Sequence, residues 1–318
     1  MSALGLDLGG TSVRAAVLDP VSGAILASAK EQHADRSPEA VVAACVRVAQ
    51  AAVAAAGCAL PGSAAIGVAG QCAGHSGLVV NAPNLGWRMV PLAERLGRAL
   101  GLRVRVLNDL SAAAIGEHRF GAARGVEDAV LFFAGSGVGA GLLVGGRLAE
   151  GGAGFAGEVG HVKVIPRPTT PERRCGCGQL GCLEAYTGGH ALTARAREAL
   201  AAGRMQGLAA AVGGDAALVI PSRIEQAAAA GDADAASLWE EAGELLGDAA
   251  ANLVTVLNPA RLVLGGGVLL GCPLLFARVE ARLRDRASAS AGQSLAVVRA
   301  ALGDDAGVVG AALAGAGG

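Results

Sequence analysis

The sequence predicts an α/β fold composed of two domains, and three observations support this prediction. At 318 residues the chain is long for one hydrophobic core, so two domains of ordinary size are expected. Segments with strand-like and helix-like spacing alternate along the chain, as they do in open α/β sheets. A strand, a glycine turn and a second strand open the chain, and this pattern returns near its middle. The repeat indicates a duplicated unit with a cleft between the copies, and two unrelated hairpins are the alternative.

The first half begins with three predicted strands and a helix. Strands are expected over Leu4–Leu8, Val13–Leu18 and Ala24–Ala29, with a glycine turn between the first two. Pro38–Ala56 has helical spacing without an internal breaker, and residues 64–70 read as a short buried strand. These elements would form a sheet covered by at least one helix.

The next segment leads to two polar residues at the end of a strand. Residues 72–87 are expected to be a loop that carries one short strand, followed by a helix over Pro91–Leu100. A strand over residues 102–107 then ends at Asn108 and Asp109, where a helix begins. Ligands of α/β sheets bind at the carboxyl ends of strands, so these two residues are candidates for a site.

The second half repeats the strand, glycine turn and strand over residues 131–144. Helices are then expected at His190–Ala201, Pro221–Ala230, Ala235–Leu257 and residues 273–286, with strands at residues 261–266 and 295–300 and a last helix from Asp305. We place the first domain at residues 1–110 plus the C-terminal helix 305–318, and the second at residues 111–304.

Charge and hydropathy exclude several classes of protein. The net charge is −1 and no long run of like charge occurs, which argues against nucleic acid or an anionic membrane surface as a partner. One long uncharged run, Ala129–Gly146, contains six glycines and alternates with turns, unlike a membrane-spanning helix. No basic region precedes the first strand, so we expect a cytoplasmic protein.

Two glycine turns are candidate phosphate-binding loops. A Walker A loop is excluded because no Gly-Lys pair exists, and Ala140 interrupts the dinucleotide-binding pattern of glycines. In the first turn, Gly9 and Gly10 would let the backbone approach an anion, Thr11 offers a hydroxyl, and Asp7 can reach a hydrated Mg²⁺.

The second turn and a third glycine cluster extend this hypothesis. The second turn would act like the first and contains Gly135, Ser136 and Gly137. The third cluster ends a predicted strand, where it could lie under a purine, and consists of Gly265, Gly266 and Gly267.

Three of the seven cysteines lie within eight residues, at positions 175, 177 and 182. A disulfide, a metal site and a chance cluster are the alternatives. A reducing compartment disfavours the disulfide, and a bridge between Cys175 and Cys177 would be strained. With His161, the three cysteines could form a closed tetrahedral shell for zinc, whereas iron–sulfur centres usually use four cysteines.

The motifs taken together resemble the ROK family (repressor, open reading frame, kinase), especially its bacterial glucokinases. They run in unbroken order from Leu4 to about Ala314 and are "DLGGT", "APNLGW", "NDLSAAAIGE", "AGSGVGAGL", "GFAGEVGH", "CGCGQLGCLEAY", "LGGGV" and "LGDDAGVVGAALAG". The resemblance implies an actin-like, hexokinase-type fold of duplicated RNase H-like domains, with a central cleft for ATP–Mg²⁺ and a sugar. The implied activity is ATP-dependent hexose phosphorylation, with D-glucose as the expected substrate.

The resemblance also assigns roles to residues. It implies that Asp109 is the general base and that Asn108 binds the sugar, although both are also favoured helix N-cap types. Glu158 and Glu184 would bind sugar hydroxyls. Asn84 would line the cleft, although a turn-forming asparagine is an alternative.

The family also carries a structural zinc, here on His161, Cys175, Cys177 and Cys182. His161 would serve the sugar as well, through its second ring nitrogen.

Several alternatives stay open at this point. The substrate could be another hexose or an N-acetylhexosamine: N-acetylmannosamine, N-acetylglucosamine, fructose or allose. Ala69–Gly70 stands where related kinases often have Pro-Gly, which bears on sugar specificity. A sugar-sensing repressor is a remote alternative, because that branch adds an N-terminal DNA-binding segment and here the first strand begins at residue 4. Polyphosphate could replace ATP as donor, and a homo-oligomer, dimer or tetramer, is expected.

Overall fold

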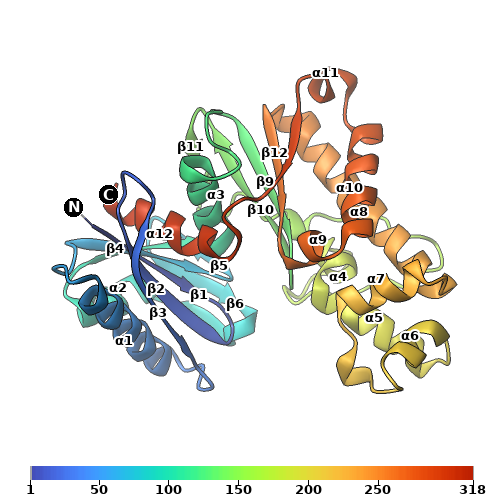
Figure 1. Cartoon of the computed structure of the whole chain (residues 1–318), viewed down its shortest axis with the longest axis horizontal. Helices are drawn as coiled ribbons and strands as arrows, with labels where there is room; N and C mark the ends of the chain where they lie inside the picture. Colours follow the sequence, from blue (N-terminus) through green and yellow to red (C-terminus); the bar gives the residue numbers. More distant parts are fainter. Residues whose placement is uncertain (1, 318) are drawn as a thin grey trace. The chain divides into compact units, whose positions relative to one another are not determined.

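The computed structural model describes residues 2–317. The chain forms two compact units (Figure 1). The first comprises Met1–Ala129, Gly141–Gly157 and Ala300–Gly318, and the second comprises Val130–Ala140 and Glu158–Arg299. The domain boundary expected after residue 110 differs from this division, which keeps the helix that starts at Asp109 in the first unit.

The first unit is built on a five-stranded sheet with the order β3-β2-β1-β4-β8. Its strands are β1 (Ala3–Leu8), β2 (Ser12–Leu18), β3 (Ile25–Gln32), β4 (Ser63–Val68) and β8 (Arg103–Asn108). β2 is antiparallel to both β1 and β3. β4 pairs in parallel with β1 on one side and with β8 on the other. The parallel strands end together, which places Asn108 at the carboxyl edge of the sheet.

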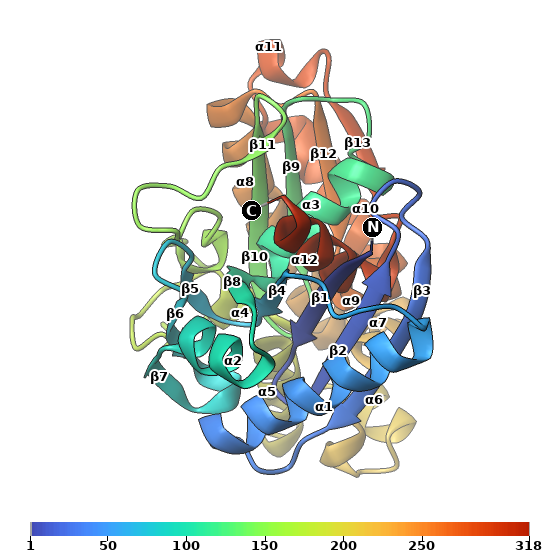
Figure 2. The same ribbon diagram turned by 90° about the vertical axis from the view of Figure 1, so that its left-hand side faces the viewer.

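One face of this sheet is covered by α1 (Pro38–Ala56), which packs on β2 and β3 (Figure 2). Ser37 caps the helix, its Oγ accepting a hydrogen bond from Ala40 N. By length and composition alone α1 could cross a membrane, but its apolar face, which includes Val41, Cys45 and Val48, is buried in the core against the sheet. That is the arrangement of a core helix, and the remaining described residues contain no other helix of this kind.

The other face is covered by α12 (Ala306–Ala316), which packs on β1, β4 and α3 (Asp109–Phe120). The backbones approach closely through glycines. A Cβ on Gly310 would lie 1.7 Å from the carbonyl oxygen of Ala112, and one on Gly5 would lie 2.3 Å from Ala312 N. These contacts tie α3 and the C-terminal helix to the first sheet.

The segment expected to carry one strand forms a small sheet of three. Its strands are β5 (Gln71–Ala73), β6 (Leu78–Ala82) and β7 (Trp87–Val90), and a short helix, η1 (Pro83–Leu85), precedes β7. The expectation of a loop with one strand was wrong because strands of three to five residues carry little alternation of polar and apolar residues. α2 (Leu92–Leu100) follows and packs on α1.

A second five-stranded sheet has the order β11-β10-β9-β12-β13. Its strands are β9 (Ala129–Ala134), β10 (Val138–Val144), β11 (Arg147–Leu148), β12 (Arg261–Gly265) and β13 (Ala296–Arg299). In both sheets the third, second, first, fourth and fifth strands follow one another across the sheet. This shared order supports the duplicated unit over two unrelated hairpins.

The helices of the second unit follow its glycine turn along the chain. They are α4 (Glu184–Thr187), α5 (Gly189–Ala201), α6 (Gln206–Ala211), α7 (Pro221–Ala229), α8 (Ala233–Leu257), α9 (Gly267–Gly271), α10 (Pro273–Arg286) and α11 (Ala289–Gly292). α8 packs along α10, where Gly243 and Gly247 lie against the side-chain stems of Arg278 and Arg282.

Candidate active site

The first glycine turn joins β1 to β2 and lies against Asn84. Gly9 N donates a hydrogen bond to the carbonyl oxygen of Ser12 (3.0 Å), which closes the turn. A Cβ on Gly10 would lie 2.8 Å from Cβ of Asn84, which η1 carries. The structure therefore brings Asn84 next to the turn that the sequence marks for phosphate.

His33 contacts this turn through two hydrogen bonds, and the sequence analysis did not identify it. Its backbone N donates to the carbonyl oxygen of Thr11 (2.9 Å), and its ring Nε2 lies 3.2 Å from the carbonyl oxygen of Gly9. The residue is buried, and Nδ1 has no hydrogen-bond partner among residues 2–317. With a proton on Nε2, the ring donates the hydrogen bond to Gly9. A single histidine after a strand gives no pattern that would have revealed this contact.

Asp7 is a buried carboxylate on β1. Its strand neighbours in register are Arg14 on β2 and, beyond it, Lys30 on β3. Burial raises the pKa of Asp7, and the positive charges of Arg14 and Lys30 oppose that shift. Arg14 Nη1 also donates to Asp305 Oδ1 (2.5 Å), and Gly307 leaves room for the Asp7 carboxylate at the start of α12.

Asn108 is the N-cap of α3, and Asp109 is the first helical residue. Asn108 Oδ1 accepts hydrogen bonds from Leu110 N (2.8 Å) and Ser111 N (3.2 Å), while its Nδ2 donates to the carbonyl oxygen of Gly70 (3.0 Å). Asp109 Oδ1 accepts from Leu110 N (3.0 Å), and the residue stays partly exposed. The capping alternative is thus confirmed for Asn108, and its amide also fixes the loop that follows β4.

The second glycine turn packs against Glu184, the first residue of α4. Glu184 Oε2 accepts a hydrogen bond from Val138 N (2.9 Å), and a Cβ on Gly137 would lie 2.4 Å from that oxygen. A Cβ on Gly160 would lie 2.1 Å from the carbonyl oxygen of Val138. The turn, Glu184 and the short helix η2 (Val159–His161) therefore form one compact arrangement within the second unit.

His161 stands between Glu158 and the cysteines. Its Nε2 lies 3.4 Å from Glu158 Oε2, and its Nδ1 lies 3.6 Å from Cys175 Sγ. Cys175 Sγ is in turn 3.8 Å from Glu184 Oε1. One ring nitrogen thus faces the cysteine cluster, and the other faces a carboxylate that the sequence assigns to sugar binding.

The cysteine cluster has the dimensions of a tetrahedral zinc site. The ligand atoms of His161, Cys175, Cys177 and Cys182 all lie within 4.8 Å of one another. Zinc bonds of about 2.3 Å to sulfur and about 2.05 Å to nitrogen give tetrahedral edges of about 3.8 Å between sulfurs and about 3.6 Å between sulfur and nitrogen. The sulfurs of Cys177 and Cys182 are 3.8 Å apart, and the distance from Cys175 Sγ to His161 Nδ1 is 3.6 Å. These residues fit a zinc ion.

The cysteines form no disulfide, and two thiols of the cluster have raised pKa values. All seven cysteines are free, so the disulfide alternative is wrong for the structure. Burial raises the pKa of the Cys175 thiol to about 12 and also raises the pKa of Cys182. Metal ligands must be thiolates, so a bound cation would offset this penalty.

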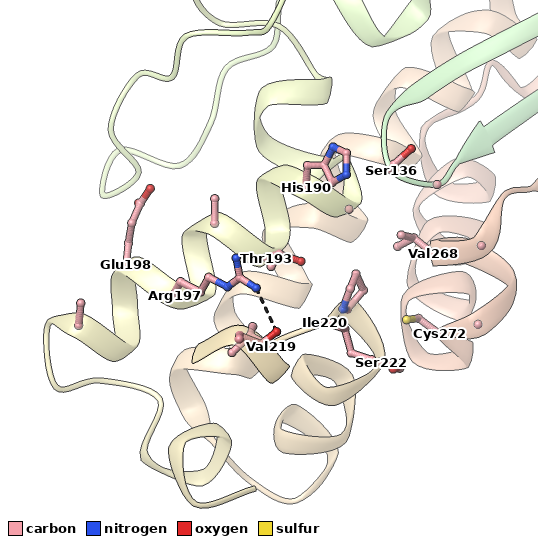
Figure 3. A pocket seen from close by; sticks show the side chains of 18 residues that line it. Ser136, His190, Thr193, Arg197, Glu198, Val219, Ile220, Ser222, Val268 and Cys272 are labelled. Atoms are coloured by element: carbon pink, nitrogen blue, oxygen red, sulfur yellow. Dashed lines mark hydrogen bonds between the residues drawn. The ribbon is translucent and has the colours of Figure 1, made fainter. Parts of the chain in front are cut away.

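A pocket of about 1150 Å³ opens beside the second glycine turn, within the second unit (Figure 3). Gly135, Ser136 and Gly267 line it, whereas Gly265 and Gly266 do not, and a Cβ on Gly266 (φ +91°) would clash with the backbone of Ala134. The remaining walls come from α5, from the residues before and at the start of α7, and from α9, and they include His190, Thr193, Val219, Ile220, Ser222, Val268 and Cys272.

Sequence reasoning found the glycine side of this pocket and missed its opposite wall. Arg197 on α5 donates through Nη2 to the carbonyl oxygen of Ala217 (3.2 Å) and through Nε to that of Ala216 (2.8 Å), which fixes the loop before α7. Ile220 and Val268 project into the pocket from α7's start and α9 (Figure 3). Single small or apolar residues on separate helices form no motif, so nothing in the sequence could have indicated them.

Comparison with known proteins agrees with this geometry. The model of the ROK family matches residues 3–315. The chain belongs to the ROK family. It is 32% identical to the glucokinase of Streptomyces coelicolor over 97% of this chain and 96% of that protein.

Two solved structures of the ROK family share the fold over nearly the whole chain. The ROK glucokinase of Streptomyces griseus, solved in complex with glucose and AMPPNP, is 33% identical with a TM-score of 0.81 and covers 100% of both chains. The ROK hexokinase of Thermus thermophilus is 31% identical with a TM-score of 0.82 and covers 99% of this chain and 98% of that chain. The predicted actin-like, hexokinase-type α/β fold is confirmed.

Proposed function

We propose that this ROK protein is an ATP-dependent hexose kinase that converts D-glucose and ATP to glucose 6-phosphate and ADP. The observation that carries the proposal is the position of Glu184. Its carboxylate binds Val138 N at the second glycine turn and also lies beside the Cys/His cluster. If this carboxylate binds the sugar, as we propose, the sugar would lie next to a candidate phosphate loop, which is the juxtaposition that phosphoryl transfer to a sugar needs.

Asp109 is the proposed general base. Its carboxylate accepts the proton of the attacking hydroxyl while the hydroxyl oxygen bonds to the γ-phosphorus, and the bond from that phosphorus to the β,γ-bridging oxygen breaks to release ADP. The hydrogen bond from Leu110 N to Asp109 Oδ1 orients the carboxylate. Asn108, fixed as the helix cap, supplies a rigid neighbour for the same sugar.

The sugar would be bound by hydrogen-bonding groups of both kinds, acceptors and donors. We assign five residues to its hydroxyls: Asn84, Asn108, Glu158, His161 and Glu184. Carboxylates accept strongly from hydroxyls, and the pairing of His161 Nε2 with Glu158 Oε2 at 3.4 Å holds both groups in one orientation.

ATP would use the glycine turns and the pocket. Backbone N–H groups at Gly9, Gly10, Gly135 and Gly137 are the proposed phosphate contacts, and the pocket lined by Ile220 and Val268 offers an apolar surface for the adenine. When bound, Mg²⁺ would neutralise charge on the transferring phosphoryl group. Asp7 is proposed to hold its hydration shell.

Zinc is proposed as a structural ion on His161, Cys175, Cys177 and Cys182. With four protein ligands the site has no open position, so it would organise the loop and not take part in the chemistry. It would join η2, which follows Glu158, to the start of α4, which carries Glu184.

A kinase for another hexose or an N-acetylhexosamine is the second candidate, and the loop after β4 favours testing it. Ala69 N donates to the carbonyl oxygen of Leu8 (3.2 Å), a hydrogen bond that the proline of related kinases cannot make. The loop that follows β4, beside Asn108, therefore has a backbone hydrogen bond that a proline at position 69 would remove.

A coupled assay of ADP release with Mg–ATP over a panel of hexoses and N-acetylhexosamines tests the proposal. We expect glucose to give the highest kcat/KM, and Asp109→Asn to lower kcat by roughly a hundredfold or more because a general base is lost. Asp285→Asn, the same change at an exposed position on α10, should retain wild-type activity. Absence of turnover with every sugar would refute the kinase assignment.

A further inference from the structure

Lysine is almost absent from this chain, yet one of its lysines contacts the Cys/His cluster. Lys30 and Lys163 are the only lysines among 26 basic residues, so 24 are arginines. Lys163 Nζ lies 3.2 Å from Cys182 Sγ and donates to the carbonyl oxygen of Leu180 (2.6 Å). Lys163 thus brings a cationic side chain to a sulfur of the cluster.

We propose that Lys163 is a positioning residue of the zinc cluster, where its ammonium donates a hydrogen bond to the Cys182 thiolate and offsets the charge of the bound site. The inference rests on the zinc assignment above and adds a residue that determines how firmly the ion is held. It predicts a measurable effect on metal retention, separate from the chemistry of phosphoryl transfer.

The backbone places Lys163 for this role. Lys163 and Cys182 are opposite each other in an isolated antiparallel bridge, so their side chains leave the pair on the same side. Two further bonds flank the bridge: Leu183 N donates to the carbonyl oxygen of Val162 and Val164 N to that of Gly181, each at 3.0 Å. The segment after His161 is thus paired with the segment that carries Cys182.

The charge of the cluster favours a nearby cation. Three thiolates and a neutral imidazole around Zn²⁺ carry a net charge of −1, and the Glu184 carboxylate lies 3.8 Å from Cys175 Sγ. An ammonium is a compact charge with three donors, which can serve a sulfur and a carbonyl oxygen at once, whereas the planar guanidinium of arginine has a fixed fork of donors. This difference gives a reason for lysine at this position in an arginine-rich chain.

Three variants test the proposal on purified, zinc-loaded full-length protein. Lys163→Met removes the charge and the donor, Lys163→Gln retains an N–H donor without the charge, and Arg174→Met is the control. Arg174 is an exposed cation of the same loop that donates to the carbonyl oxygen of Gly178 and not to a sulfur. The readouts are zinc content by mass spectrometry and the rate of zinc transfer to a chromophoric chelator.

We expect Lys163→Met to lose zinc roughly tenfold faster than wild type, in the range seen for outer-shell partners of metal ligands. Lys163→Gln should fall between, and Arg174→Met should match wild type. If Lys163→Met does not fold, zinc release from Lys163→Gln that is faster than from wild type still decides the question. Wild-type release rates in both Lys163 variants would overturn the proposal.

Cobalt substitution adds a spectroscopic readout. Loss of a hydrogen bond to a thiolate makes its electrons easier to transfer, so the thiolate-to-Co²⁺ charge-transfer band of Lys163→Met should move to lower energy. A purely structural role of Lys163 would leave that band unchanged, and such a result would contradict the hydrogen bond. A wild-type protein that binds neither zinc nor cobalt would instead refute the zinc assignment itself, so the two failures are distinguishable.

Discussion

At the scale of single residues, Glu184 connects three features of the second unit. It begins α4, accepts a hydrogen bond from the second glycine turn and lies beside the Cys/His cluster. The close approach of Gly137 to its carboxylate leaves no room for a side chain on the turn. A change at Glu184 should therefore affect sugar binding and the shape of the turn together.

Glu184→Gln should lower kcat/KM for glucose by roughly a hundredfold, because the amide replaces a charged acceptor in a site built for hydroxyls. Its NH₂ would also face Val138 N as a second donor if the amide oxygen turned to the sugar. Steady-state kinetics with varied glucose measures this effect, and Glu280→Gln on α10, which pairs with Arg284, is a control outside the site. Unchanged kinetics in Glu184→Gln would contradict its assignment.

His33 provides a prediction for the first glycine turn. His33→Phe keeps a buried ring but removes the hydrogen bond to the carbonyl oxygen of Gly9, so the turn should loosen. We expect KM for ATP to rise roughly fivefold while KM for glucose changes little, since a bond worth about 1 kcal/mol is lost at the phosphate loop. His33→Gln, which can still donate, should recover part of the loss. Equal effects on both KM values would argue against this role.

At the scale of elements, the long periodic segments and the glycine turns were predictable. The sheet strands and α1, α5, α8 and α10 follow a clear period in the sequence, and the structure has them at nearly the expected bounds. The three short strands β5 to β7 were missed because each carries too few residues to show a period. The pocket wall formed by Ile220 and Val268 was missed for another reason: its residues come from separate elements that only the fold brings together.

The candidate site divides in the same way. Residues that belong to a motif, such as Asp109 or Cys177, were identified through the resemblance to the ROK family. Positions such as His33 and Lys163 act through contacts across the chain and belong to no motif. The resemblance to the family accounts for the first group, whereas the second group needs three-dimensional distances.

Packing of α12 on α3 depends on Gly310 and gives an element-scale prediction. Gly310→Ala would place a Cβ 1.7 Å from the carbonyl oxygen of Ala112, so the helices must move apart. We expect the free energy of unfolding to fall by about 3 kcal/mol, at the upper end for overpacked cores. Urea unfolding followed by circular dichroism measures this change. Gly62→Ala, with no atom within 4 Å of the new Cβ, is the control, and equal stability of both variants would contradict the packing.

At the scale of the whole molecule, the two sheets share one strand order, and each glycine turn joins the first two strands of its sheet. Because of this duplication the chain has two candidate phosphate-binding turns, one in each sheet. The second copy carries an addition absent from the described part of the first: the loop with the Cys/His cluster. The addition separates a structural task, metal binding, from the catalytic task assigned to Asp109.

Removal of the metal tests this division of tasks. If zinc organises η2 and the start of α4, dialysis against a strong chelator should lower the melting temperature by several degrees, because binding energy at a structural zinc site is folding energy. Stabilisation by added glucose should shrink in the same sample. Differential scanning calorimetry with and without zinc restoration provides the measurement. A melting temperature insensitive to chelation and to added zinc would show that the cluster holds no structural metal.

The central claim is phosphoryl transfer to a hexose with Asp109 as base. The most direct measurement is ³¹P NMR of a mixture of glucose, Mg–ATP and protein, which identifies the product instead of inferring it from ADP. We predict that wild type produces a glucose 6-phosphate resonance as the γ-phosphate signal declines, and that Asp109→Asn does so at least a hundredfold more slowly. ATP loss that yields only inorganic phosphate, or an Asp109→Asn rate equal to wild type, would contradict the claim.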